Sequence, residues 1–391
     1  MAWYNFGKQE KKTFEVNTES ELFSTFSTPF GKIGKGDLAA PYIRSYGSEP
    51  FVRFGNDNLY PQLINQMYFK SPLNGSIINF KTNAVIGGGF DLVSVDTSAK
   101  QKINEYTFIK KNKFKKLMRQ ATKDLIMHGR VCIIVDPTSK DVKLTRVGPE
   151  MVRNNWNKLV YTVSPDWSRS IDMVEYPPYN PTLTVKSMWI YEIDGDAGQD
   201  LYPLPQYLSA ANWFFVDGEM SYLQKSNMIN SIFPSFMITI AKKFKTQEEK
   251  DEFVKTVNNA KGAPEAGRIM TFAADVPEQL PNITAIPTNT NDKLFTETTE
   301  AIQSNIAFAH SIDPLLMGIR VSGKLGSGND IAISYQIFEK NVVMPLREMM
   351  TEIGDDLLSI GGINSSIEIN NYQIIDNVIV DKTDDTKNNT I

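Results

Sequence analysis

The chain has 391 residues, a formal net charge of −4 and a pI near 5.5, with 41% hydrophobic and 22% charged residues. This composition is ordinary for a folded protein of two or three packed modules, and the acidic balance argues against a tight, sequence-reading DNA-binding protein without excluding weak, sliding contact with DNA. One cysteine, Cys132, and two histidines, His128 and His310, exclude a disulfide framework and a Cys/His zinc site within one chain.

The sequence contains no run of eighteen apolar residues and no N-terminal signal pattern. We therefore expect a soluble intracellular protein with no membrane partner. Residues 1–50 are broken by glycines and a proline, and they are predicted to form an N-terminal arm with little core of its own.

A more regular region starts at the strand-like run Phe51–Phe54. Pro61 then opens a first helix and Pro72 a second, since proline is tolerated in the first helical turn. The second helix is predicted to end at Gly87–Gly89. This glycine run follows a helix rather than a strand and forms no G-x-G-x-x-G pattern, so it indicates a helix stop and not a dinucleotide loop.

The third predicted helix runs over residues 101–128 and carries the densest positive patch of the chain. The patch comprises Lys110, Lys111, Lys113, Lys115, Lys116, Arg119 and Lys123. Such a patch is typical of a solvated helix face, and contact with an acidic partner or with nucleic acid is the alternative interpretation.

Short strands are predicted after this helix, at residues 131–135, 142–147, 158–163 and 187–193. The first two are joined by a turn-forming segment and are expected to form a hairpin. Cys132 lies in the first strand, where a buried structural residue is favoured over a nucleophile. Residues 51–205 are therefore predicted to be one α+β module.

Two long helices then enclose an insert. The helical period returns over 206–228, and a second helix is predicted over 291–312. Between them, residues 229–290 are expected to form a strand (236–241), a helix (246–260) and a strand (268–272). A compact insert between two long helices predicts a small domain on a stalk.

The glycine-rich loop 313–328 matches the Walker A spacing at Gly318, Gly323 and Lys324, but Leu325 stands where a magnesium-binding hydroxyl is required. The preceding residues also continue a helix, whereas a phosphate-binding loop follows a buried strand. No set of carboxylates, histidines or nucleophiles forms a catalytic pattern elsewhere. We therefore predict no enzyme activity, no cofactor and no metal site.

Apolar residues at steps of three and four predict one long helix over 329–358, with a kink at Pro345. These residues are Ile331, Tyr335, Phe338, Val342, Leu346, Met349, Ile353 and Leu357. A last strand is expected at Ser366–Asn370, and the polar composition beyond Asp376 predicts a short, partly disordered tail over 359–391.

Several segments together resemble the portal proteins of tailed bacteriophages, the ring-shaped head–tail connectors. Asn230 with Phe233–Ser235 is similar to the family's break after its first stem helix, and Ala266–Ile269 to the start of its second clip strand. Ile312–Gly318 is similar to the family's Val-Pro-Pro-x-Leu-Leu-Gly segment, and Asn329–Phe338 with Pro345 to the helix that follows. Over residues 206–346 individual residues resemble those of the family, whereas over 51–205 only the architecture resembles it.

The resemblance implies an α+β, portal-like fold. Residues 51–205 and the kinked helix 329–358 would form the wing, 206–228 and 291–312 the two stem helices, 229–290 the β-α-β clip, and 313–328 the tunnel loop. A full crown is not expected, because only residues 359–391 follow the long helix. The chain would form a ring of about twelve copies at one capsid vertex, the channel for DNA packaging and ejection.

The resemblance also implies partners and site residues. The ring would be assembled in the host cytoplasm, would become part of the virion, and would contact duplex DNA without reading its sequence, the terminase, a head–tail adaptor and the major capsid protein. DNA would pass the tunnel-loop residues Ile319, Arg320, Val321, Ser322, Lys324 and Leu325. Subunits would pack through Tyr207, Ala211, Phe214 and Tyr222 of the stem, and the adaptor would contact Lys242, Lys243 and Arg268 of the clip.

Two alternatives stay open. One is another virion structural or scaffold protein with a stalked domain. The other is an ATP-driven packaging motor subunit, which Leu325 disfavours.

Overall fold

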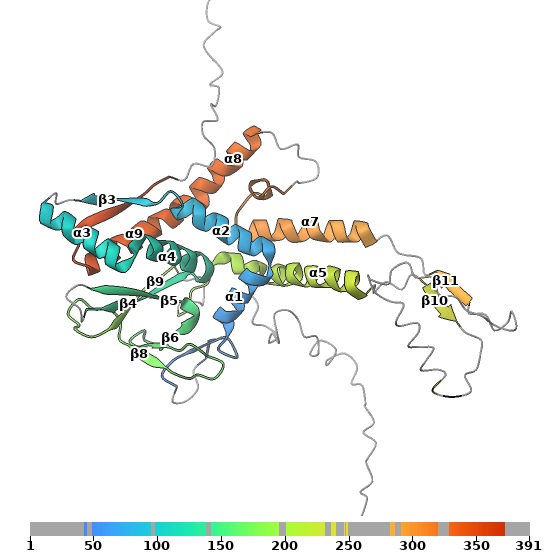
Figure 1. Ribbon diagram of the computed structural model, residues 1–391, viewed down its shortest axis with the longest axis horizontal. Coiled ribbons are helices and arrows are strands. Elements are labelled where there is room, and N and C mark those ends of the chain that lie inside the picture. Colours follow the sequence, from blue (N-terminus) through green and yellow to red (C-terminus); the bar gives the residue numbers. More distant parts are fainter. Residues whose placement is uncertain are drawn as a thin grey trace, which may run out of the picture.

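The computed structural model describes residues 43–44, 49–94, 98–137, 142–194, 201–230, 236–239, 246, 248, 282–285, 291–319 and 328–371. Figure 1 shows three parts: an α+β body, a stalk of two helices that projects from it, and a strand pair beyond the end of the stalk. Among the described residues, none of the helices combines the length and apolar composition that crossing a bilayer requires.

The first two helices of the body are joined by a single residue. Helix α1 covers Tyr60–Lys70 and α2 covers Pro72–Ile86, and each has a proline in its first turn, as predicted. Ser71 ends α1 and begins α2, where its hydroxyl accepts a hydrogen bond of 3.3 Å from the backbone N–H of Asn74. This serine satisfies one of the free N–H groups that every helix start leaves.

The predicted helix over 101–128 is wrong in one respect, because it is two helices. Helix α3 covers Ala99–Asn112 and α4 covers Phe114–His128, with Lys113 between them in the left-handed conformation at φ 48°. The change of direction lets Phe114 enter the core, where it is fully buried. Tertiary packing therefore overrides a helical pattern that is continuous in the sequence.

Three small antiparallel sheets complete the body. Strand β4 (Arg130–Asp136) lies between β5 (Lys143–Val147) and β9 (Ser187–Glu192), so the predicted hairpin is confirmed. Strand β7 (Tyr161–Val163) lies between two strands that the sequence did not predict, β6 (Val152–Asn154) and β8 (Val174–Tyr176).

The third of these sheets joins distant parts of the chain. Strand β12 (Ser365–Ile369) pairs with β3 (Phe90–Ser94), which confirms the predicted last strand. A further pair, β1 (Ile43–Arg44) with β2 (Arg53–Phe54), lies near the start of the described chain.

The stalk begins with the 3-10 turn η2 (Gln206–Ala210) and continues as α5 (Ala211–Asn230), with α7 (Asn291–Ala309) returning beside it. Helices α1, α2, α4 and α9 (Met344–Ile360) and the base of the stalk share one hydrophobic core. The stalk is therefore continuous with the body and not a separately folded unit.

At the tip, β10 (Phe236–Thr239) pairs with β11 (Asn282–Ala285). No strand is predicted from the sequence at 282–285. The predicted strand at 268–272 and most of the predicted helix 246–260 lie outside the described residues.

The long helix predicted over 329–358 is interrupted. Helix α8 (Gly328–Phe338) leads into the five-residue π-helix η6 (Glu339–Val343), and α9 follows with Pro345 in its first turn. The N–H of Met344 bonds to the carbonyl of Glu339, five residues back. A kink was predicted at Pro345, whereas the interruption is a π-turn that ends two residues before this proline.

Candidate functional site

The stalk helix α7 ends in a tightly closed turn. Ser311 adopts a left-handed conformation at φ 53°, and the N–H of Ile312 bonds back to the carbonyl of Ala307 at 3.0 Å. Ala307 and Ile312 are buried, so the turn is held by the core on the side from which the chain continues. This backbone pattern satisfies carbonyl groups that the end of a helix would otherwise leave free.

His310 fixes the same turn to two other elements. Its ring stacks on that of Tyr207 with centroids 4.7 Å apart and an interplanar angle of 13°. Its Nε2 lies 2.9 Å from Oδ1 of Asn74. Burial, with the charge of Lys81 as a second cause, holds the pKa of His310 well below its ordinary value of 6.5. His310 is therefore a neutral, structural histidine at physiological pH.

The chain then forms the 3-10 turn η5 (Pro314–Met317), which Asp313 caps. One oxygen of Asp313 accepts a hydrogen bond of 3.0 Å from the N–H of Leu315, and the other accepts one of 2.8 Å from the hydroxyl of Ser334 in α8. Gly318 follows at φ 73°, and Ile319 N–H bonds to the carbonyl of Pro314 at 3.1 Å. The described chain is thus held by η5 on one side of residues 320–327 and by α8 on the other.

A shallow groove of about 520 Å³ lies between α5 and α7 next to this turn. Its lining is mostly polar and consists of Gln224, Thr296, Thr299, Glu300, Gln303, Gly318 and Ile319. Within the described parts of the chain, no group of three or more His, Cys, Asp or Glu side chains is placed to hold a metal ion.

The single cysteine and the second histidine are also buried in the fold. Burial raises the pKa of Cys132 to about 12, so its thiol is protonated at neutral pH and is a poor nucleophile. Burial, together with the charges of Arg130, Arg146 and Arg153, lowers the pKa of His128 to about 3. Cys132 is fully buried in β4, as the sequence predicted.

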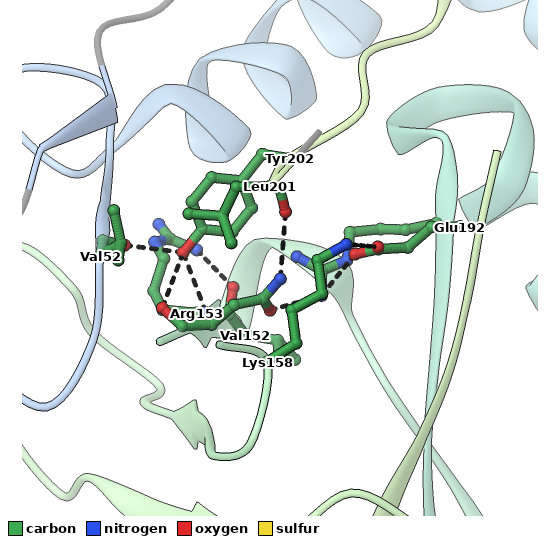
Figure 2. A network of polar contacts seen from close by, with 9 residues as sticks. Val52, Val152, Arg153, Lys158, Glu192, Leu201 and Tyr202 are labelled. Carbon is green, nitrogen blue, oxygen red and sulfur yellow. Dashed lines mark hydrogen bonds and ion pairs between the residues drawn. The ribbon is translucent and has the colours of Figure 1, made fainter. Parts of the chain in front are cut away.

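A buried polar network fixes the point where the body passes into the stalk (Figure 2). The hydroxyl of Tyr202 donates to the carbonyl of Val52 at 2.7 Å and accepts from the N–H of Asn154 at 2.9 Å. The Asn154 amide in turn donates to the carbonyl of Leu201 at 3.1 Å. The segment that leads into the stalk is therefore bonded to β6 and to the residue before β2.

Two arginines complete this network. Arg153 bonds to the side chain and the carbonyl of Asn58, both at 2.7 Å, and burial lowers its pKa to about 10. Arg130 lies 3.4 Å from Glu192, which also pairs with Lys158 at 2.6 Å. Nothing in the sequence marks Arg130 and Arg153 as interior residues, because arginine is seldom fully buried.

The four residues predicted to pack between subunits in the stem differ in their exposure to solvent. Tyr207, Ala211 and Phe214 are buried inside the single chain, which leaves them almost no surface for contact with another subunit. Tyr222 is 59% exposed and keeps that possibility. Of the predicted DNA-channel residues, only Ile319, two residues after η5, is described. The others lie outside the described residues, namely Arg320, Val321, Ser322, Lys324 and Leu325. The predicted clip residues Lys242, Lys243 and Arg268 also lie outside them.

No protein-family model and no curated protein sequence matches this chain. Solved structures do. The chain is similar to a protein in the virion of the native gene transfer agent particle, with 14% sequence identity and a TM-score of 0.53 over 80% of this chain and 84% of that one. It is also similar to a protein in the neck of the native gene transfer agent particle with C12 symmetry, with 14% identity and a TM-score of 0.52 over 79% and 83% of the two chains.

A third similar structure is an HK97-family phage portal protein from Corynebacterium diphtheriae, at 11% identity over 78% of this chain and 94% of that one, with a TM-score of 0.47. At 14% identity, the two gene transfer agent structures show a shared fold. The α+β fold predicted from the sequence is therefore confirmed, and the chain shares it with these two particle proteins.

Proposed function

We propose that this chain, which has a portal-like fold, is the portal subunit of a tailed phage or a related particle. Copies of the chain would form a ring at one vertex of the capsid, and DNA would pass through the ring during packaging and ejection. The observation that carries the proposal is the fold shared with a protein in the neck of the native gene transfer agent particle, a neck with C12 symmetry. The same comparison supports the proposal of a ring of about twelve copies.

The three parts of the molecule correspond to the parts of such a ring. The body would be the wing, comprising 51–205 and 329–358, and the stalk helices within 206–228 and 291–312 would be the stem. The tip pair β10–β11 lies within the proposed clip, 229–290. Figure 1 supports this assignment, because α5 and α7 connect the tip pair to the body.

Residues 313–328 would be the tunnel loop that faces the channel. Its two ends are fixed by the bonds of Asp313 and Gly318, so the intervening residues start from a defined position. The predicted channel residues include two cations, Arg320 and Lys324. Since each additional phosphate contact increases affinity through counterion release, a sparse set of cations suits a channel in which DNA slides.

Contact between subunits would use the exposed side of the stalk. Tyr222 of α5 and Phe308 of α7 are 59% and 77% exposed, and burying large apolar side chains of this kind favours association. The clip residues Lys242, Lys243 and Arg268 would contact a head–tail adaptor. Terminase and the major capsid protein would be further partners of the assembled ring.

Native mass spectrometry and negative-stain images of the purified full chain test the proposal. We expect closed rings of about twelve subunits with a central hole wide enough for duplex DNA. A chain that stays monomeric at micromolar concentration, or assembles without a central hole, contradicts the proposal and favours another virion structural protein with a stalked domain. Turnover of ATP by the monomer would instead support a motor subunit.

A further inference from the structure

Helix α9 and strand β12 enclose a strongly acidic groove of about 680 Å³. Its lining includes five carboxylates, from Glu348, Glu352, Asp355, Asp356 and Glu368. The one cation in the lining, Arg347, is directed inward, where it pairs with Glu339 and bonds to the carbonyls of Ala84 and Val85. No basic side chain of the lining therefore pairs with the five carboxylates.

The acidic side chains of this groove are not paired with cations in the described chain. Glu348, Asp356 and Glu368 are exposed and have no hydrogen-bond or ion-pair partner there, and Glu352 accepts a bond of 2.9 Å from the hydroxyl of Tyr191. Partial burial and the neighbouring charges of Glu352 and Asp355 raise the pKa of Asp356. A cationic partner would relieve this mutual repulsion.

A basic surface lies on α4. Between residues 106 and 128 the sole acidic residue is Asp124, which is buried and paired with Arg146 at 2.5 Å. The exposed side chains Lys115, Lys116 and Arg119 follow one another along the helix, with Lys123 beyond them. Lys115 and Lys116 have no ion-pair partner in the described chain. We call this surface the basic face, and the groove on α9 and β12 the acidic face.

The two faces point away from each other. Helices α4 and α9 touch where Met118 meets Gly354, since a Cβ on that glycine would lie 3.3 Å from Cε of Met118. At about 100° per residue, Lys116, Arg119 and Lys123 lie roughly 100–160° around α4 from Met118, and Lys115 lies roughly 60° from it, at the margin of the basic face. By the same measure Glu348, Glu352 and Asp356 lie roughly 120–160° around α9 from Gly354.

We infer that the acidic face of one subunit receives the basic face of the next subunit in the ring, as a head-to-tail contact between the bodies of neighbouring copies. This inference rests on the ring proposed above. A single chain that carries two complementary faces pointing in different directions has what a heterologous, ring-closing interface requires. Charge complementarity across such a contact sets its register and accelerates association.

Two reversed variants test the contact in the full chain. The acidic-face variant is Glu348→Lys with Asp356→Lys, and the basic-face variant is Lys115→Glu with Lys116→Glu. None of these four side chains has a hydrogen-bond or ion-pair partner in the described chain, so the fold should survive each exchange. Glu175→Lys, at an exposed position of β8, is the control for reversal of surface charge as such.

Each variant alone is expected to remain monomeric at concentrations where the wild type and the control form rings, because like charges then meet at every interface. An equimolar mixture of the two variants should restore rings in which the variants alternate. The reversed face of one variant then meets the reversed face of the other, the two unchanged faces meet likewise, and both contacts join opposite charges. A chain that carries all four substitutions should also form rings. Native mass spectrometry counts the subunits, and circular dichroism verifies folding.

If either variant alone forms rings, the inference is overturned. It is also overturned if both variants fold but rings form neither in their equimolar mixture nor from the chain that carries all four substitutions. Loss of DNA binding by the basic-face variant with rings intact would assign that face to DNA and also overturn it. These outcomes leave the proposed portal function standing, whereas a monomeric wild type refutes both. If a double reversal impairs folding, the single exchanges Glu348→Lys and Lys116→Glu apply the same mixing test.

Discussion

The hydroxyl of Ser334 donates a hydrogen bond of 2.8 Å to Asp313, and this bond joins the two chain segments on either side of residues 320–327. The other oxygen of the same carboxylate caps η5 through the N–H of Leu315. One side chain thus starts the turn before the proposed tunnel loop and fixes the helix after it.

Replacing Asp313 should therefore loosen the loop at its base. In Asp313→Ala we expect a loss of about 1 kcal/mol from the missing cap and faster tryptic cleavage after Arg320 and Lys324. Limited proteolysis followed by mass spectrometry measures the cleavage rates. Ser334→Ala keeps the cap and should show a smaller effect. Equal rates in the wild type and in Asp313→Ala would show that this carboxylate does not govern access to the loop.

The cations of the loop are expected to act on DNA and not on assembly. Arg320→Glu with Lys324→Glu should form rings of wild-type size but impair packaging or retention of the genome, because the loop would then repel phosphates. Lys340→Glu, at an exposed position in η6, is a matched control that should package normally. Packaged DNA is measured per particle after nuclease treatment. Normal packaging by the double variant would refute the role given to both residues.

The buried neutral histidine predicts a dependence of stability on pH. The unfolded chain binds a proton on His310 below about pH 6.5, whereas the folded chain resists it, so the free energy of unfolding should fall as the pH drops below that value. The loss is at most about 1.4 kcal/mol per pH unit for each such histidine. Urea unfolding at pH 7.5 and 5.5 should show a smaller loss in His310→Gln than in the wild type. An identical loss in the two proteins would contradict the prediction.

The hydroxyl of Tyr202 should contribute to stability through its two bonds at the base of the stalk. In Tyr202→Phe the ring keeps its stacking on Phe54, at a centroid distance of 4.3 Å, but the carbonyl of Val52 loses its donor. We expect a cost of about 1–3 kcal/mol, as for other buried groups left unpaired. Tyr106→Phe, at an exposed position, should change the free energy of unfolding by much less. Denaturant unfolding of both variants distinguishes the network from a general effect of removing a hydroxyl.

Gly354 is needed where α4, α9 and β12 meet. A Cβ at this position would lie 2.1 Å from Cδ1 of Ile367, which is itself buried. Although alanine favours a helix over glycine by about 1 kcal/mol, overpacking of about 1–3 kcal/mol should make Gly354→Ala less stable than the wild type. Ser359→Ala, at an exposed position on the same helix, is the control. A raised melting temperature in Gly354→Ala would show that the core relaxes around the added methyl group.

The helical periods of the stalk and the strands around Cys132 could be predicted from the sequence because they follow local pattern and propensity. The break at Lys113 could not, since it depends on the burial of Phe114 by distant residues. Strand β11 was missed because it is short and has no long alternating pattern, and its pairing with β10 is what defines it.

The glycines and the flanking helices predicted the position of the proposed loop, but they did not predict the contacts on either side of it. Asn74, Tyr207 and His310 meet through the fold alone, since they come from three separate elements. The same holds for the acidic face, which combines residues of α9 with Glu368 of β12. Sequence pattern locates elements, whereas such clusters depend on how the elements pack.

The π-turn η6 changes the phase of the long helical segment. The apolar positions Val342, Leu346 and Met349 are only partly buried against the core, whereas their neighbours Val343, Arg347 and Met350 are buried. The guanidinium of Arg347 thereby reaches the last carbonyls of α2. One extra residue in the turn corresponds to a rotation of about 100°, so the side of α8 on which Ser334 meets Asp313 depends on this single added residue.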